Sequence, residues 1–330
     1  MMPRSGFVLI AALWLIVALS AVALDSALRS QPARLAAANR LDETRAREAA
    51  LAGVELVRSR LTAATLNRAE QIRADVSRQE GSSGRRQSVR SLLSVDDVWR
   101  DPQGLVPPGM SLGDAEFSVT VRGTGERLNI NEADEEMIRA FLSQGLRNDY
   151  AAADQLTQAI LDWRDEDDLP RLNGGEREQY LEDGLPVLPP NRPFASVAEL
   201  RHVRGMTDEV FAQVEPFLTV IGSGMININA APEAVLFAVP GLTVAVVAAL
   251  LPIRSGGRYL QDRIDLEELT GFDIPEGMRP SEFNRRVTFA TNEVEIISEG
   301  SIAGNPVHTV VRAVAARSAE GAVVLWRRIE

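Results

Sequence analysis

Six carboxylates fall within fourteen residues near the middle of this 330-residue chain, between Asp165 and Glu178. Pro170 and the pair Gly174–Gly175 interrupt the stretch, so we expect a loop. Carboxylates this close repel one another unless a cation neutralises them or the loop stays solvated. Hard oxygen ligands on a flexible loop suit Ca²⁺, which takes about six to eight oxygens. The residue types alone leave a calcium site and a plain solvated loop both open.

The spacing of these carboxylates does not fit an EF-hand loop, which needs glycine at its sixth position and glutamate at its twelfth. Catalytic chemistry has little support elsewhere, because cysteine is absent and the two histidines, His202 and His308, lie far apart. Neither histidine has a nucleophile partner in a recognisable motif. We therefore expect no enzyme, which sets aside the alternative of a calcium-dependent periplasmic enzyme. Without cysteine, the chain fits a reducing compartment or a periplasmic protein that does without disulfides.

Two segments, 128–142 and 226–239, repeat an Asn-Ile-Asn strand end followed by an amphipathic helix. The second asparagine of each, Asn131 and Asn229, is predicted to cap the helix. Two further segments, 203–207 and 239–243, join helices through glycine, with threonine as the next cap. Such units resemble helix-hairpin-helix domains, many of which bind DNA phosphates. The alternative function is therefore a nucleic-acid-binding protein with a membrane anchor or signal peptide.

Charge argues against nucleic acid as a partner. The formal net charge is −11, from 46 acidic and 35 basic residues. A surface this acidic repels a phosphate backbone, and no lysine stands near the two hairpins. We therefore interpret the two hairpins as parts of a small helical scaffold that serves packing rather than nucleic-acid binding.

The N-terminal stretch from Phe7 to Leu24 holds eighteen residues without a charge, and Asp25 ends it. As a helix it is roughly 27 Å long, close to the hydrocarbon thickness of a bilayer. It is a cleaved secretory signal, a plain membrane anchor or a prepilin-type leader. Residues 21–23 (Ala-Val-Ala) offer a signal-peptidase site. The amphipathic helical pattern that continues beyond Asp25 argues against that interpretation.

Gly6–Phe7, the short basic leader, the uncharged helix and the amphipathic continuation together resemble type IV prepilins and type II secretion pseudopilins. This resemblance implies cleavage after Gly6 by the prepilin peptidase and N-methylation of Phe7. Most members carry Glu as the fifth residue after the cut, where it neutralises the terminal amine of a neighbouring subunit. Here that residue is Ala11. The departure resembles the large K-type minor pseudopilin, which occupies a unique position at the filament tip.

The acidic loop also resembles this family, since K-type pseudopilins bind calcium through W-x-D-x-D-[DN]…G-A-E-D-x-Y-Y. Two positions depart from the pattern: Arg177 stands in place of Asp and Gln179 in place of the first Tyr. The resemblance implies a structural Ca²⁺, either with Glu178 as a substitute for the lost Asp or with one ligand fewer. The positions that match are Trp163, Asp165, Asp167, Asp168, Gly174, Glu176 and Tyr180. The expected metal ligands are Asp165, Asp167, Asp168, Glu176 and Glu178.

Hydrophobic periodicity predicts an α+β fold: a long N-terminal helix packed on an antiparallel sheet, interrupted by a large helical insert. The amphipathic helix should run over 25–66, with a bend or break at Pro32. Strands are predicted at 95–99, 115–122, 128–131, 293–302, 308–317 and 322–329. Helices are predicted in the insert at 132–143, 147–164, 197–203, 208–216, 231–238, 243–251, 260–269 and 281–286.

The expected domain organisation follows from these elements. A leader (1–6), a transmembrane helix (7–24) and its amphipathic continuation (25–66) precede a pilin-like domain in two parts, 67–127 and 291–330. Between the parts lies a helical insert (128–290) that resembles SAM and helix-hairpin-helix domains. The family resemblance implies a single-pass inner-membrane protein with a periplasmic C-terminal domain. Its partners would be the I and J minor pseudopilins, the prepilin peptidase and inner-membrane lipid, with no nucleic acid.

Overall fold

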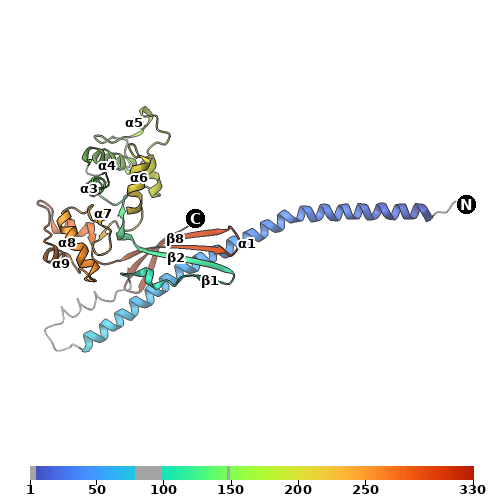
Figure 1. Cartoon of the computed structure of the whole chain (residues 1–330), viewed down its shortest axis with the longest axis horizontal. Helices are drawn as coiled ribbons and strands as arrows, with labels where there is room; N and C mark the ends of the chain where they lie inside the picture. The colour runs from blue at the N-terminus through green and yellow to red at the C-terminus, as the bar shows by residue number, and fades with distance from the viewer. Residues whose placement is uncertain (1–4, 79–98, 147–148) are drawn as a thin grey trace.

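The computed structural model describes residues 5–78, 99–146 and 149–330, without the side chains of 5–8, 11, 26–33, 72 and 74–78. Helix α1 (Ser5–Arg78) is continuous over 74 residues. The predicted end near Asn67 is wrong, because the residues after it are good helix formers without Gly or Pro up to Arg78. Pro32 does not end the helix either. Figure 1 shows instead that α1 changes direction in its N-terminal half, as a proline inside a helix favours.

In the part of the chain that the structure describes, no helix is both long enough and apolar enough for a membrane crossing.

A five-stranded antiparallel sheet forms the frame, in the order β1-β2-β7-β8-β9. Strand β2 pairs with β7 along its whole length, although the insert separates them in sequence. This pairing confirms the predicted frame of helix and sheet interrupted by an insert. The strand predicted at 95–99 lies outside the described residues except for Trp99, which is buried in a turn. The strands are β1 (Met110–Leu112), β2 (Ala115–Gly123), β7 (Glu293–Ile302), β8 (His308–Ser318) and β9 (Gly321–Ile329).

Small residues bring α1 close to this sheet, and Figure 1 shows the helix crossing it and extending far beyond. A Cβ at Gly53 would lie 2.1 Å from Ser298 Oγ, and one at Gly300 would lie 2.0 Å from the Ala46 carbonyl oxygen. Neither position therefore tolerates a side chain without displacing the helix. The buried stripe that α1 presents to the sheet consists of Ala46, Ala49, Ala50, Val54, Val57 and Leu61.

The insert consists of two units of similar design, each closed by a short parallel strand pair. In the first unit β3 (Leu128–Asn129) pairs with β4 (Leu218–Thr219). In the second, β5 (Ile226–Asn227) pairs with β6 (Val287–Thr288). The first unit contains α3 (Glu135–Gly145), α4 (Tyr150–Arg164), α5 (Arg177–Glu182), η3 (Val197–His202), α6 (Asp208–Val214) and η4 (Glu215–Phe217). The second contains α7 (Glu233–Leu236), α8 (Val244–Ser255), α9 (Arg263–Thr270) and α10 (Pro280–Arg286).

The two repeated asparagines anchor distant backbone segments, and the prediction that they cap helices is wrong. Asp134 caps α3, and Pro232 precedes α7. The Asn131 amide accepts from the Phe194 N–H at 2.8 Å and donates to the Phe194 carbonyl at 3.0 Å. The Asn229 amide makes the same pair of bonds with Leu260, at 3.0 and 2.7 Å. Each asparagine therefore ties the loop after the short strand to a distant segment of its own unit.

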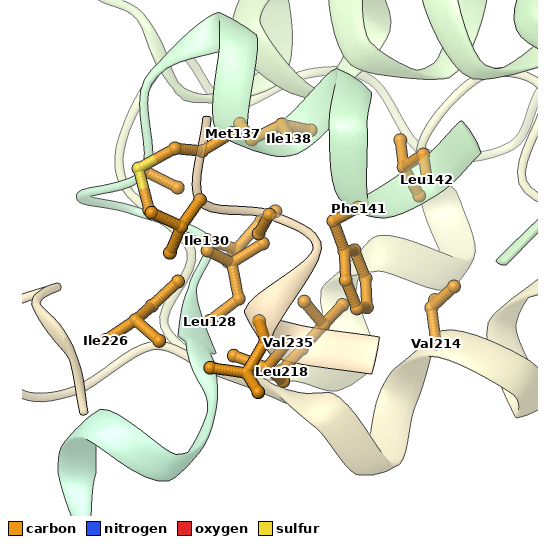
Figure 2. Packing of buried hydrophobic residues seen from close by; sticks show 14 of the residues in the cluster. Leu128, Ile130, Met137, Ile138, Phe141, Leu142, Val214, Leu218, Ile226 and Val235 are labelled. Atoms are coloured by element: carbon orange, nitrogen blue, oxygen red, sulfur yellow. The ribbon is translucent and has the colours of Figure 1, made fainter. Parts of the chain in front are cut away.

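One hydrophobic core runs through both units of the insert. Figure 2 shows side chains of α3 and β3 from the first unit meeting Ile226 and Val235 of the second. The two units therefore share one core, which includes Trp163 and Tyr180 at the two ends of the acidic loop. The labelled core residues are Leu128, Ile130, Met137, Ile138, Phe141, Leu142, Val214, Leu218, Ile226 and Val235.

Candidate metal centre

The acidic loop begins at the end of α4 and returns to the core at α5. Trp163, in the last turn of α4, is buried and stacks on Phe194 with ring centroids 5.9 Å apart. Tyr180 of α5 lies against the same indole at 6.1 Å. Its hydroxyl accepts from the Arg204 N–H at 2.8 Å. These aromatic contacts fix both ends of the loop, so its carboxylates are held above a rigid base.

Asp162, which the sequence interpretation did not single out, is fully buried beneath the loop. Its carboxylate accepts from the backbone N–H groups of Arg171 and Gly175, at 3.1 and 2.8 Å. A Cβ at Gly174 would lie 2.2 Å from its Oδ2, so this position requires glycine. The sequence contains one signal: a carboxylate in the last turn of a helix is disfavoured by the helix dipole and needs a specific partner.

Glu176 is the most deeply buried of the predicted metal ligands. It is 3% exposed, and neither carboxylate oxygen has a hydrogen-bond partner among the described residues. Burial, and then the negative charges of Asp162, Asp165, Asp168 and Asp167, raise the pKa of Glu176 to about 7. Burying a carboxylate without a partner is costly, so a cation bound next to Glu176 would stabilise the folded protein.

Other oxygen atoms of the loop are also left without partners. Asp165 Oδ1 is buried and unpaired, and burial raises the pKa of that carboxyl as well. Asp168 Oδ1 accepts from Asn191 Nδ2 at 2.9 Å. Asn191 Oδ1 is again buried without a partner. Asn191, which sequence reasoning missed, therefore brings a further hard oxygen to the loop.

The remaining predicted ligands are less enclosed. Asp167 is exposed, and its Oδ1 accepts from the Leu169 N–H at 2.8 Å. Glu178 is exposed in the first turn of α5 and is not among the carboxylates with the largest effect on Glu176. Gln179, where the family pattern has Tyr, accepts from the Glu176 N–H at 2.9 Å and so fixes the start of α5.

The donor set consists of carboxylate and amide oxygens, which suits a hard divalent cation. Orphaned oxygens on Asp165, Glu176 and Asn191 are the observation that supports such a cation. Within the described ranges, no three acidic or histidine side chains converge closely enough to hold a metal ion as they stand. A bound cation would therefore require the carboxylates to draw together.

The raised pKa of Glu176 predicts how metal-free stability depends on pH. The carboxyl has a usual pKa of 4.5 and a folded-state pKa of about 7. Between these values the folded protein holds a proton that the unfolded chain has lost, so stability falls as pH rises through this window. We expect Glu176→Gln to remove this part of the slope when melting in EDTA is followed from about pH 5 to pH 7.5. Glu178→Gln, at an exposed site, should keep it; equal slopes for wild type and Glu176→Gln would contradict this assignment.

Two other predicted features also have places in the structure. Gly6 and Phe7 lie in the first turn of α1, and the side chains of Phe7 and Ala11 fall outside the description.

The two helix–Gly–helix turns are confirmed: Gly205 and Gly241 have φ of +83° and +87°. Thr207 and Thr243 cap the helices that follow, as predicted. A Cβ at Gly241 would touch Pro275 and Phe272, so this hairpin packs inward.

A long N-terminal helix packs on an antiparallel sheet, and a helical domain is inserted between two neighbouring strands of that sheet. The similarity to known proteins is more specific. Residues 121–223, which include the acidic loop, match the family model of type II secretion system (T2SS) protein K. The resemblance to K-type pseudopilins is thereby confirmed for this part of the chain.

Individual relatives agree with the family match. A segment of 95 residues is 39% identical to type II secretion system protein K of Aeromonas hydrophila and covers 28% of each chain. A segment of 88 residues is 33% identical to the Klebsiella pneumoniae protein K and covers 27% of each. The matched segments thus span little more than a quarter of these relatives' length.

A solved structure extends the similarity of the fold. It is a chain in the crystal structure of the GspK-GspI-GspJ complex from the enterotoxigenic Escherichia coli type 2 secretion system. The TM-score is 0.52 at 19% sequence identity, and the match covers 68% of this chain and 83% of that chain. The fold likeness therefore reaches well beyond the segment matched by sequence.

Proposed function

We propose that this protein is a K-type minor pseudopilin, a structural subunit at the tip of a type II secretion pseudopilus that serves protein export across the outer membrane. The observation that carries the proposal is the position of the insert. A segment matching the protein K family model is held between β2 and β7 of a pilin-like helix-and-sheet frame. The bulk of the insert suits a single terminal position better than repetition along a fibre.

We also propose that residues 7–24 anchor the protein in the inner membrane, with the C-terminal domain in the periplasm. This N-terminal part of α1 carries large apolar side chains that no other described element covers, such as Leu13, Trp14 and Leu19, which are 62%, 69% and 61% exposed. Cleavage by the prepilin peptidase after Gly6 and methylation of Phe7 would place the mature terminus at the start of this helix. Lipid would then cover the apolar side chains.

A structural Ca²⁺ in the acidic loop completes the proposal. Asp165, Asp167, Asp168 and Glu176 would hold it, with Asn191 or Glu178 as a further oxygen donor. The ion would neutralise carboxylates that now repel one another, and it would stabilise the loop. Asp162 would support the site from below through its bonds to the loop backbone.

The partners we propose are the I and J minor pseudopilins, which should pack against α1 between residues 33 and 61. The soluble part without residues 1–30 should elute with both partners as one complex in size-exclusion runs at micromolar concentration. Leu41→Glu, at a 50% exposed site on α1, should weaken the complex strongly, because it buries a charge in a helix interface. Ile264→Glu, at a 49% exposed site on α9, is the matched control and should leave assembly intact. Separate elution of all three proteins would contradict the proposed partners.

A further inference from the structure

Arg171 lies among the carboxylates of the acidic loop. Its Nε is 3.3 Å from Asp162 Oδ1, and its Nη2 is 3.3 Å from Asp165 Oδ2. Asp162 is fully buried and Asp165 is half-buried, so the guanidinium lies over a largely enclosed pair of negative charges. One side chain thus bridges the buried support of the loop and a proposed metal ligand.

No other cation of the described chain forms an ion pair with this group of carboxylates. Arg164 is adjacent in sequence, but its guanidinium donates to the carbonyl oxygens of Ile130 and Ala133. Arg177 is exposed, and within the described residues no hydrogen bond or ion pair involves its side chain. Arg171 is therefore the cation that bonds directly to both Asp162 and Asp165.

We propose that Arg171 is a resident counter-cation, which holds Asp165 in the metal-free protein and must release it when a divalent cation binds. This inference rests on the proposed calcium site. A guanidinium bonded to Asp165 would lie within a few ångströms of a cation bound to the same carboxylate, and the two positive charges would repel each other. The divalent cation would therefore replace the Arg171 guanidinium as the positive charge bonded to Asp165.

The position of Arg171 allows this exchange. The residue is exposed, and so are its neighbours Leu169 and Leu172, at 75% and 86%. Its own side chain is 42% exposed. Moving the guanidinium into water would cost little packing, whereas Asp165 and Glu176 remain held at the base of the loop. The competing interpretation is that Arg171 orients Asp162 and Asp165 and so assists metal binding.

The sign of one affinity change separates the two interpretations. Arg171→Gln removes the charge at similar side-chain length, and Arg177→Gln makes the same change in net charge on the same loop without breaking an ion pair. Calcium affinity would be measured by titration calorimetry on the soluble domain, and melting temperature in EDTA by circular dichroism. We expect Arg171→Gln to melt below Arg177→Gln in EDTA and to bind calcium at least about tenfold more tightly. Affinity equal to or weaker than that of Arg177→Gln would overturn the proposal.

Two further outcomes keep this inference distinct from the calcium proposal itself. Calcium binding by Arg171→Gln alone would support the counter-cation and contradict a bound calcium in the native protein. An absence of binding in wild type and both variants would overturn both. If Arg171→Gln does not fold in EDTA, Arg171→Lys serves instead, since it keeps the charge but loses the fork that bridges two carboxylates. It should bind calcium more tightly than wild type, and weaker binding would count against the proposal.

Discussion

The soluble domain is expected to melt at a higher temperature in millimolar calcium than in EDTA. Metal-free, the loop holds Glu176 buried without a partner and close to four other carboxylates. A cation that binds only the folded protein adds RT ln(1 + [L]/Kd) to stability, about 2.7 kcal/mol at a hundredfold excess over Kd. Identical melting curves in calcium and EDTA, with metal analysis confirming that no ion is bound, would show that the loop is merely solvated.

Two glutamates of the loop provide a matched pair for this experiment. Glu176→Gln should abolish most of the calcium-dependent rise, since it removes the buried carboxylate that lies among the other acidic groups. In EDTA at neutral pH the same variant should melt above wild type, because it no longer buries a repelled charge. Glu178→Gln, at an exposed position, should retain most of the rise. The reverse order would place the ion at Glu178 rather than at Glu176.

Asn229→Ala is expected to destabilise the insert by about 3 kcal/mol or more. The side chain is 7% exposed and satisfies the Leu260 N–H, the Leu260 carbonyl and the Phe289 carbonyl. Removing it takes a partner from two buried groups of Leu260 and from the partly buried Phe289 carbonyl, and each such loss at a buried group costs about 1–3 kcal/mol. Chemical denaturation followed by circular dichroism measures the difference.

The equivalent change in the first unit offers an internal comparison. Asn131 makes similar bonds to Phe194, but it is only half-buried, so water can replace part of what Asn131→Ala removes. We therefore expect a smaller loss there than at Asn229. Asn292→Ala, at an exposed position, should change stability by less than about 0.5 kcal/mol. A loss at Asn229 no larger than at Asn292 would refute the anchoring role.

The frame of the fold was predictable from sequence because its elements are long and periodic. Strand β2 alternates buried and exposed residues along its whole length, which is the period-two pattern expected of a half-buried strand. The short parallel pairs of the insert carry no such signal, since each strand has two residues and its partner is distant in sequence. Helix α5, with six residues, is likewise too short to show a helical period.

The candidate site was predictable only in part, for a related reason. The residue types of the loop predicted its cluster of carboxylates, and the glycines predicted its turns. What lies underneath depends on tertiary contacts: Asp162 receives its bonds from Arg171 and Gly175, and Asn191 reaches Asp168 from another segment. The spacing of residues along the sequence does not predict such tertiary contacts. The prediction that the repeated asparagines cap helices is wrong for the same reason, because their actual partners, such as Phe194 and Leu260, are also distant in sequence.

The identity of the mature N-terminus tests the pseudopilin account most directly. The protein would be expressed with its prepilin peptidase, purified from the membrane fraction and analysed by intact mass and N-terminal peptide mass spectrometry. The account predicts a chain that begins at Phe7 and carries one N-methyl group. A Gly6→Val variant should block cleavage and retain residues 1–6. A mature terminus at Leu24 in the wild-type protein would establish a secretory signal peptide and contradict the account.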